Sequence, residues 1–475
     1  MLKVAIIVYV LLSIFLFDPK LYTGGDNVNY LILAKSITTG QGYKDIHRPT
    51  QPQHRQYPVG LPLVLAPFWN SLFLSKIIIV LFGVGSLFYF YGLCKKLFKS
   101  NYWIPVIFFL TTPVLYFYNH YILTEIPFLF FVLGALYYAS TLRGRSDLAA
   151  VGFAAAACLM RSVGIGLLLA IMLHYTITKR YFSMLISQIA TILVLLFTQK
   201  GSYFTQIIAQ NPYNLSEGTL SIYEIIARFW HNFSLYFGQI LPSSVYPDMH
   251  SSIVAIYSFI LIAIIGYAVY VLWKKEKVIV FYFLTMTGII LAWPTVWASD
   301  RFLIPIIPIV IIFLGVAFCD LAKKKSKVIK IVVSIILPIC IIYNCTMIVK
   351  GGIVQTRLNF AYLQGDRLAG YTQDWRNYFN VCEQLPDEKC TVIARKPEFV
   401  YWLSGNKSNI YRMDNDMTKI QSQLAGYDYV IVDSFQWTSS TDHYLIPALK
   451  HNDFGKKFRA VYKTESPEFY LLKRI

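Results

Sequence analysis

The segment around which the rest of the chain is interpreted is residues 22–67, which read YTGGDNVNYLILAKSITTGQGYKDIHRPTQPQHRQYPVGLPLVLAP. Asp26 follows two glycines and precedes a short apolar stretch over residues 28–37. Gly40 and Gly42 are typical of a helix end, so this stretch is predicted to be a short helix. A basic run with histidines follows, and apolar sequence resumes after Pro58. The segment is therefore a polar loop set between hydrophobic stretches.

The composition excludes an ordinary soluble protein. Of the 475 residues, 56% are hydrophobic and only 14% are charged, and the mean hydropathy is +0.51. These values are typical of a polytopic membrane protein. The formal charge is +18, but the cations form short clusters between hydrophobic runs, which indicates the positive-inside pattern and not a nucleic-acid-binding surface. The clusters are Lys95-Lys96, Arg143/Arg145, Lys179-Arg180, Lys274-Lys275/Lys277 and Lys323-Lys324-Lys325/Lys327.

Apolar segments long enough to cross a membrane recur along the first part of the chain. Since a crossing takes about 20 helical residues, we predict about eleven spans. They lie near residues 3–17, 72–93, 102–119, 125–142, 147–160, 162–177, 181–199, 252–272, 278–294, 302–320 and 328–349. The pair 147–160 and 162–177 is one apolar run broken by Arg161, and two crossings keep the flanking cations on one side.

The charge pattern predicts the orientation of these spans. With the N-terminus in the cytoplasm, every basic cluster is cytoplasmic. The loop 18–57, the long loop 200–251 and the chain from residue 350 are then exported. We therefore expect a transmembrane domain over residues 1–349 and an extracytoplasmic domain over residues 350–475.

The chain after residue 350 has a different pattern. Strand-like runs at 391–394, 429–432 and 469–472 alternate with helix-like stretches at 374–385, 396–403 and 417–424. Such alternation predicts a small α/β domain. Cys382 and Cys390 are its two cysteines, and in an exported domain they could form a disulfide or remain free.

Two acids are candidate catalytic groups. Asp26 precedes a helix, so its carboxylate could cap the free N–H groups there, and a carboxylate oriented in this way could also be a fixed base. Glu125 lies at the entry of an apolar span, where an acid should face the bundle interior or water. The alternative for Glu125 is an ordinary first-turn residue before Pro127.

Two arginines lie at predicted outer ends of spans, where the charge rule disfavours them. Arg161 has no acid beside it in the sequence, and a phosphate ligand would explain its position. Arg301 could bind phosphate as well, or it could pair with Asp300 or extend to the interface. A carboxylate and several cations at the mouth of a membrane bundle suggest chemistry on a phosphate-bearing lipid.

The basic run of the first loop adds further candidates. His54, Arg55 and Tyr57 could contact a substrate or simply face lipid headgroups. His120 lies in the corner before Glu125. The histidines do not fall at metal-ligand spacing, so no metal site is predicted.

Four stretches in this order resemble the polytopic glycosyltransferases of the GT-C class. The closest similarity is to the protein O-mannosyltransferase-like group, which includes the enzyme that transfers aminoarabinose to lipid A. The stretches are Gly24-Gly25-Asp26 through Gly40-Gln-Gly42-Tyr43, Tyr57-Pro58-Val-Gly60-Leu-Pro62-Leu, Leu123-Thr124-Glu125-Ile-Pro127 and Arg301-Phe-Leu-Ile-Pro305-Ile-Ile-Pro308.

The resemblance implies that Asp26 is the general base and that Glu125 is the second acidic position. The implied donor is a sugar linked through phosphate to a polyprenol, in the outer leaflet of a bacterial inner membrane, and the implied acceptor is a glycolipid, a glycan or a protein. Many relatives carry Lys or Arg beside the loop proline, where this chain has Tyr57, so Arg55 is expected to substitute. His54 and His120 are candidates for contacts with donor or acceptor.

The implied chemistry needs few groups, because a phosphate leaves as a stabilised anion. One base for the acceptor hydroxyl and cations against the developing charge are sufficient. A single displacement inverts the anomeric centre, and no metal or nucleotide cofactor is expected. Two alternatives remain, which are a lipid-linked sugar flippase and an oligosaccharide polymerase or ligase. The latter would depend on Arg228 and His231 of the loop 200–251.

Overall fold

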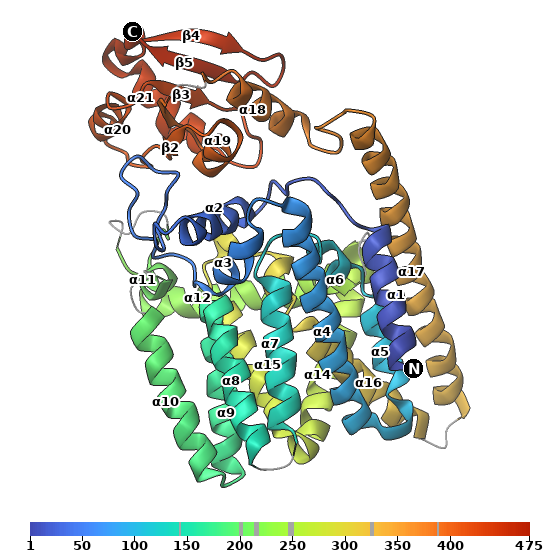
Figure 1. Cartoon of the computed structure of the whole chain (residues 1–475). Helices are drawn as coiled ribbons and strands as arrows, with labels where there is room; N and C mark the ends of the chain where they lie inside the picture. The colour runs from blue at the N-terminus through green and yellow to red at the C-terminus, as the bar shows by residue number, and fades with distance from the viewer. Residues whose placement is uncertain (142–143, 199–202, 213–217, 246–250, 324–326, 387–388) are drawn as a thin grey trace.

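The structure is a computed structural model that describes residues 1–141, 144–198, 203–212, 218–245, 251–323, 327–386 and 389–475. A helical bundle carries a small sheet-containing domain at one end (Figure 1). Helix α1 (Leu2–Phe15) lies beside α17 (Lys327–Leu363), which leads from the bundle into that domain. Because α17 continues past residue 349, the predicted domain boundary falls inside a helix.

Helices occupy each of the segments predicted to span the membrane. Besides α1 and α17, the long bundle helices are α4 (Leu72–Phe98), α7 (Glu125–Ala139), α8 (Arg145–Met160), α9 (Ile165–Ile177), α10 (Tyr181–Thr198), α14 (Ser251–Lys275), α15 (Lys277–Ala292) and α16 (Ile307–Lys323). Among the described residues, three helices are long and apolar enough to cross a membrane, namely Leu72–Asn101, Val254–Lys275 and Pro338–Leu363. The number of crossings remains a prediction.

Two segments are interrupted where the sequence demands it. The predicted span 102–119 is two helices, α5 (Trp103–Thr111) and α6 (Pro113–Tyr118). Thr112 between them is extended, because the ring of Pro113 disfavours helical backbone in the residue before it. The predicted break at Arg161 is confirmed, since Arg161 is extended between α8 and the short helix η3 (Ser162–Gly164).

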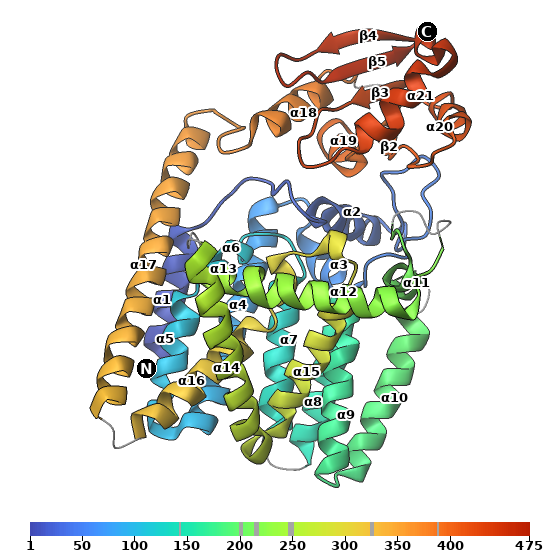
Figure 2. The ribbon, with the colours of Figure 1, turned by 180° about the vertical axis from the view of Figure 1, so that it is seen from behind.

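Short helices cover the end of the bundle that faces the small domain. They are α2 (Asn27–Thr38), α3 (Gly60–Leu65), α11 (Tyr203–Ile208), α12 (Ile222–Leu235) and α13 (Leu241–Val245). Figure 2 shows that α12 lies across the bundle helices and not along them. The predicted first loop is thus a folded cap, and the long loop 200–251 is partly helical.

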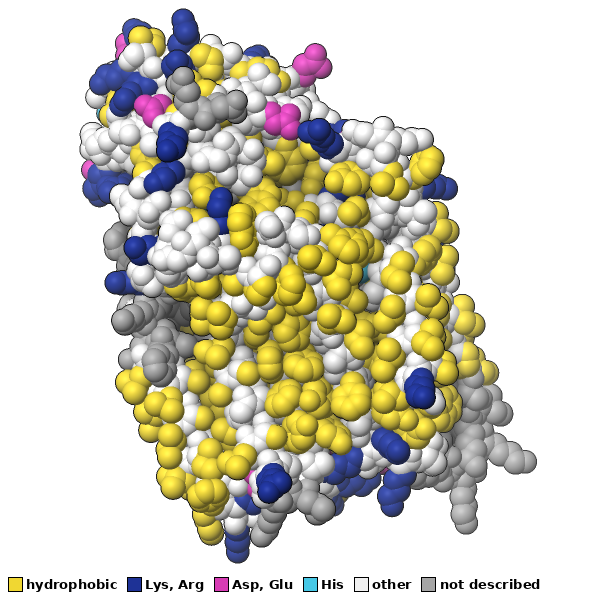
Figure 3. All heavy atoms as spheres, viewed as in Figure 1, with side chains coloured by type: hydrophobic (Ala, Val, Ile, Leu, Met, Phe, Trp, Pro, Cys, Tyr) yellow, Lys and Arg dark blue, Asp and Glu magenta, His cyan; other side chains and the backbone are white. Residues whose placement is uncertain are grey.

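Charged and apolar side chains are segregated along the bundle. Hydrophobic side chains cover most of the face seen in Figure 3, and Lys and Arg gather toward the two ends. The turns with Lys95-Lys96, Lys179-Arg180 and Lys274-Lys275 lie at the end opposite the small domain (Figure 1), and Lys96 Nζ is 3.4 Å from Glu276 Oε2. Arg143, Lys324 and Lys325 lie outside the described residues.

The small domain is built on a five-stranded sheet of order β2-β1-β3-β5-β4. Strands β1 (Thr391–Ile393), β2 (Lys407–Asn409) and β3 (Tyr429–Val432) are parallel to one another. Strand β5 (Tyr470–Arg474) is antiparallel to both of its neighbours, β3 and β4 (Phe458–Lys463). The domain's helices are α18 (Gln373–Glu383), α19 (Pro397–Ser404), α20 (Met417–Leu424) and α21 (Ile446–Lys450). The predicted α/β character is confirmed. Cys382 and Cys390 are both buried and are not joined in a disulfide.

Candidate functional site

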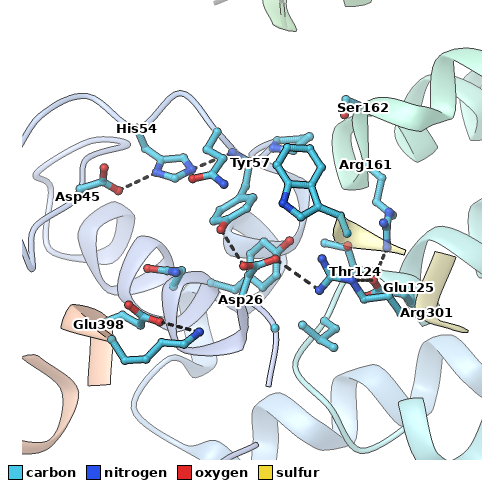
Figure 4. Close-up of a pocket in the computed structure, with 18 of the residues that line it drawn as sticks. Asp26, Asp45, His54, Tyr57, Thr124, Glu125, Arg161, Ser162, Arg301 and Glu398 are labelled. Carbon is cyan, nitrogen blue, oxygen red and sulfur yellow. Dashed lines mark hydrogen bonds and ion pairs between the residues drawn. The ribbon is translucent and has the colours of Figure 1, made fainter. Parts of the chain in front are cut away.

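A cavity of about 450 Å³ lies where the bundle, the first loop and the small domain meet. Its walls come from segments that are far apart in the sequence. They are the first loop, the turn before α7, the break between α8 and α9, helix α11, the connection between α15 and α16, and the segments that follow β1, β2 and β3 in the small domain. Figure 4 shows the charged side chains that converge there.

Asp26 occupies the N-cap position of α2 without acting as a side-chain cap. Its backbone carbonyl accepts the helix bond from Tyr30 N at 3.2 Å, but its carboxylate caps no helix N–H group. The carboxylate instead accepts a hydrogen bond from Tyr57 Oη at 2.8 Å and lies 3.6 Å from Arg301 Nη1 (Figure 4). Asp26 therefore begins the helix through its backbone carbonyl, and its carboxylate is not used to cap the helix.

The turn before Asp26 requires glycine. Gly25 has a φ of +65°, and a Cβ atom there would lie 3.1 Å from Arg301 Nη1. A side chain at this position would therefore be strained and would crowd the arginine. Asn27 fixes the same turn, because its amide donates to the carbonyls of Tyr22 and Gly24 at 2.6 and 3.0 Å.

A chain of hydrogen bonds runs from Asp45 through His54 to Tyr57. His54 Nδ1 lies 2.6 Å from Asp45 Oδ1, and His54 Nε2 accepts from Tyr57 N at 2.8 Å. This arrangement places the imidazole proton on Nδ1. Burial would raise the pKa of Asp45, but the interaction with His54 and the charge of Arg48 lower it. Tyr57, predicted to contact substrate, thus holds Asp26 through its hydroxyl, and His54 holds the backbone of Tyr57.

Glu125 is the acid that joins the two arginines. It is 2% exposed, its Oε1 accepts from Arg161 Nη1, and Arg301 Nε lies 3.8 Å from the same oxygen. Both guanidinium groups lie over the ring of Phe302, at 5.3 and 5.0 Å. Arg161 therefore has an acidic partner that its sequence neighbours did not indicate.

One interpretation expected Arg301 to pair with its neighbour Asp300. The two side chains do not form an ion pair in the structure. Asp300 Oδ1 instead accepts a hydrogen bond from Tyr118 Oη at 2.7 Å. Burial would lower the pKa of Arg301, but Glu125 and Asp26 outweigh this effect and raise it. Arg301 is consequently a permanent cation between two carboxylates.

Two predicted site residues lie elsewhere. Arg55 is exposed and is not among the residues that line the cavity, so the expected substitution for a basic residue beside Pro58 is not observed. His120 is buried against Phe17, with ring centroids 5.4 Å apart, and it also lies outside the cavity lining. Burial, with Lys76 nearby, lowers the pKa of His120 to about 3.

The sequence interpretation missed several lining residues. Arg48 lies 3.7 Å from Asp45 Oδ2, and burial lowers the pKa of His47 to about 4. Both belong to the basic run, which was a signal for their importance. Arg395, Lys396, Glu398 and Trp437 come from the small domain, and nothing in their local sequence indicated the cavity.

The arrangement can support chemistry on an anion. Of the two predicted catalytic acids, Asp26 lines the cavity with a side chain that is 28% exposed, whereas the Glu125 side chain is 2% exposed and contacts both arginines. A carboxylate held by a tyrosine hydroxyl can accept a proton, and adjacent guanidinium groups can bind an oxyanion.

No protein-family model matches the sequence, and no curated protein matches it. The fold does match solved structures. ArnT from Cupriavidus metallidurans bound to undecaprenyl phosphate has a TM-score of 0.59 at 12% identity, covering 100% of this chain and 98% of that chain. Its apo state has the same TM-score and identity with 97% of that chain covered.

The Archaeoglobus fulgidus oligosaccharyltransferase tethered with an acceptor peptide has a TM-score of 0.56 at 11% identity, covering 100% of this chain and 74% of that chain. These neighbours are GT-C glycosyltransferases. The predicted resemblance to the GT-C class is therefore confirmed at the level of the fold.

Proposed function

We propose that this chain is an integral-membrane glycosyltransferase that moves a sugar from a polyprenyl-phosphate donor to an acceptor hydroxyl. The observation that carries the proposal is the cavity in which Asp26 and Arg301 face each other, with Glu125 and Arg161 behind them. The GT-C fold and the undecaprenyl phosphate bound to ArnT support a lipid-linked donor.

Asp26 acts as the general base in this proposal. Its carboxylate takes the proton of the acceptor hydroxyl as the hydroxyl oxygen attacks the anomeric carbon. The bond between that carbon and the phosphate oxygen breaks, and polyprenyl phosphate leaves with the electron pair. Arg301 and Arg161 stabilise the negative charge on the leaving group, which is where preorganised cations contribute most to the rate.

The surroundings of the second acid favour inversion. A retaining mechanism would need a second carboxylate as nucleophile. Glu125 is buried and contacts both arginines, so we assign it to positioning them and not to attack on the sugar. A single displacement by the acceptor inverts the anomeric centre.

The orientation follows from the same proposal. The end of the bundle that carries the cavity and the small domain faces the exported side, and the described basic clusters face the cytoplasm. In a bacterium, the membrane would be the inner membrane. Candidate acceptors are a glycolipid, a glycan or a protein.

The test is Asp26→Asn in purified protein reconstituted with a radiolabelled polyprenyl-phosphate sugar and a cell-envelope extract that supplies acceptor hydroxyl groups. We expect release of the sugar from the lipid to stop, while binding of polyprenyl phosphate and the thermal unfolding midpoint remain near those of the unchanged protein. Sugar release by this variant at the original rate would remove Asp26 from the mechanism.

The polymerase or ligase alternative has no comparable support. Arg228 donates to the backbone carbonyls of Ile207 and Ala209, at 2.5 and 3.1 Å, and so braces its own loop. His231 is exposed. Neither residue lines the cavity between the bundle and the small domain. Nothing in the site favours the flippase alternative over transfer.

A further inference from the structure

The small domain is docked on the first loop by specific contacts. Helix α19 packs on α2, and Ser408 N donates to the carbonyl of His47 at 2.8 Å. Lys35 Nζ lies 5.2 Å from the ring of Trp69 and 5.0 Å from the ring of Tyr401. These contacts fix which edge of the sheet faces the cavity.

The carboxyl-terminal end of the parallel strands faces the cavity, and this is the end at which α/β domains bind ligands. In the parallel part of the sheet, β1 lies between β2 and β3, so the chain passes from β1 to one neighbour and then crosses to the other side. Ligands of open α/β sheets bind outside the carboxyl ends of strands where the order reverses in this way. Arg395 and Lys396 follow β1, and Trp437 follows β3, and all three line the cavity.

The side chains at this edge form a cationic cluster. The Arg395 guanidinium and Lys396 Nζ each lie 5.3 Å from the ring of Trp437, and Arg395 Nε donates to Ser440 Oγ at 3.2 Å. Lys396 Nζ is 3.7 Å from Glu398 Oε1. The two cations are therefore held in place by neighbouring groups before any ligand binds.

Arg395 differs from the other cations of the cavity. Arg48, Arg161, Arg301 and Lys396 each have a carboxylate oxygen within 4 Å. Within the described part of the chain, no carboxylate lies this close to Arg395. Asp433, the nearby acid after β3, is buried and accepts from Thr441 Oγ1 at 2.7 Å, and burial raises its pKa. The guanidinium group of Arg395 is thus available to an anion from outside.

We propose that Arg395, Lys396 and Trp437 form a subsite for an acidic substituent, phosphate or carboxylate, of the acceptor saccharide. The proposal rests on the proposed transferase function and adds the chemical class of the acceptor. The donor phosphate binds at Arg161 and Arg301 on the bundle side, and the acidic group of the acceptor binds on the side of the small domain. Asp26 lies in the wall between them, where the acceptor hydroxyl must lose its proton.

The experiment is saturation-transfer NMR on the full chain in nanodiscs, with glucose 6-phosphate, glucuronate and glucose as probes. We expect the acidic sugars to bind and glucose not to bind, and the two acidic probes distinguish phosphate from carboxylate. Arg395→Gln should weaken binding of the acidic probe about tenfold, since charge-assisted hydrogen bonds are the strong ones. Lys396→Gln, a second variant at the same edge, should weaken it about threefold.

Arg301→Gln is the matched control, because a phosphate probe could also enter the donor side. Binding that survives Arg301→Gln and falls in Arg395→Gln supports the subsite. Equal binding of glucose, unchanged binding in both Arg395→Gln and Lys396→Gln, or loss only in Arg301→Gln would overturn it. Probe binding should also persist in Asp26→Asn, so failure of the transferase mechanism would not be mistaken for failure of the subsite.

Discussion

Removing the charge of Glu125 should destabilise the protein far more than removing the charge of Asp26, although both acids belong to one site. The Glu125 side chain is 2% exposed and contacts two guanidinium groups. Breaking a buried ion pair by removing one partner costs about 3–5 kcal/mol, because the remaining charge stays buried. In Glu125→Gln the amide oxygen still accepts a hydrogen bond, and Phe302 still lies under both guanidinium groups. We therefore expect Glu125→Gln to lower the free energy of unfolding by about 3 kcal/mol, the lower end of this range.

Asp26→Asn removes an acid that is 28% exposed and whose distance to Arg301 is 3.6 Å. Water screens such a pair, so the expected cost is below about 1 kcal/mol. The assay is thermal unfolding in one detergent, followed by tryptophan fluorescence, together with titration of polyprenyl phosphate. Glu125→Gln should unfold at a lower temperature and bind polyprenyl phosphate more weakly than the unchanged protein. Asp26→Asn should show neither change. Glu383→Gln, at an exposed position of α18, is the control for the chemical change itself.

Equal unfolding midpoints for the unchanged protein and Glu125→Gln would refute this reasoning. They would mean that the two arginines are stabilised without Glu125. A large loss of stability in Asp26→Asn would count equally against the division of roles.

Two further predictions concern the first loop. Tyr57→Phe removes the hydroxyl that holds the carboxylate of Asp26, so transfer should fall about tenfold in kcat with donor KM unchanged, because a misplaced base is a poorer catalyst; an unchanged kcat would contradict this. His47 has its pKa lowered to about 4 by burial, so the unfolded chain binds more protons between that value and about 6.5, and stability falls as the pH falls through this window. Acidification from pH 7.5 to 5 should cost about 2 kcal/mol more in the unchanged protein than in His47→Asn, measured as the difference in unfolding free energy, and equal losses would exclude His47.

The positions of the bundle helices along the chain were largely predictable, because the length of each apolar run decides where helices form in such a chain. Every predicted span is occupied by helix, and the break at Arg161 follows from one charged residue in an apolar run. The break at Thr112 was also encoded, by Pro113, but hydropathy alone does not register a proline between apolar residues.

The small domain shows where such pattern reasoning ends. The prediction identified β1, β3 and β5 because their apolar residues are contiguous. Strand β2 is only Lys407–Asn409, and β4 contains the charged residues Arg459 and Lys463, so neither has the apolar signature. Pairing with a neighbouring strand, and not intrinsic preference, makes these segments strands.

The residues of the site could be predicted from the sequence better than the pairs that they form. Glu125, Arg161 and Arg301 were singled out because charge is costly at the ends of apolar spans. Asp26 was singled out because it precedes a short helix in the first loop, and the structure brings all four together. Their pairing could not be predicted, since Glu125 begins α7 whereas Arg161 lies in the break after α8. Sequence adjacency suggested Asp300 for Arg301, and the fold instead supplies acids from elsewhere in the chain.

The pairing of Arg301 has a consequence for the order of events in the proposed reaction. In the structure, Arg301 lies between Asp26 at 3.6 Å and Glu125 at 3.8 Å, and neither distance is that of a short hydrogen bond. A phosphate group offers the guanidinium a bidentate contact, which is stronger than these two loose ion pairs. Donor binding would therefore draw Arg301 toward the phosphate and leave the Asp26 carboxylate held by Tyr57 alone. The base would become free to accept a proton only when a leaving group is in place, which protects the site from proton abstraction without transfer.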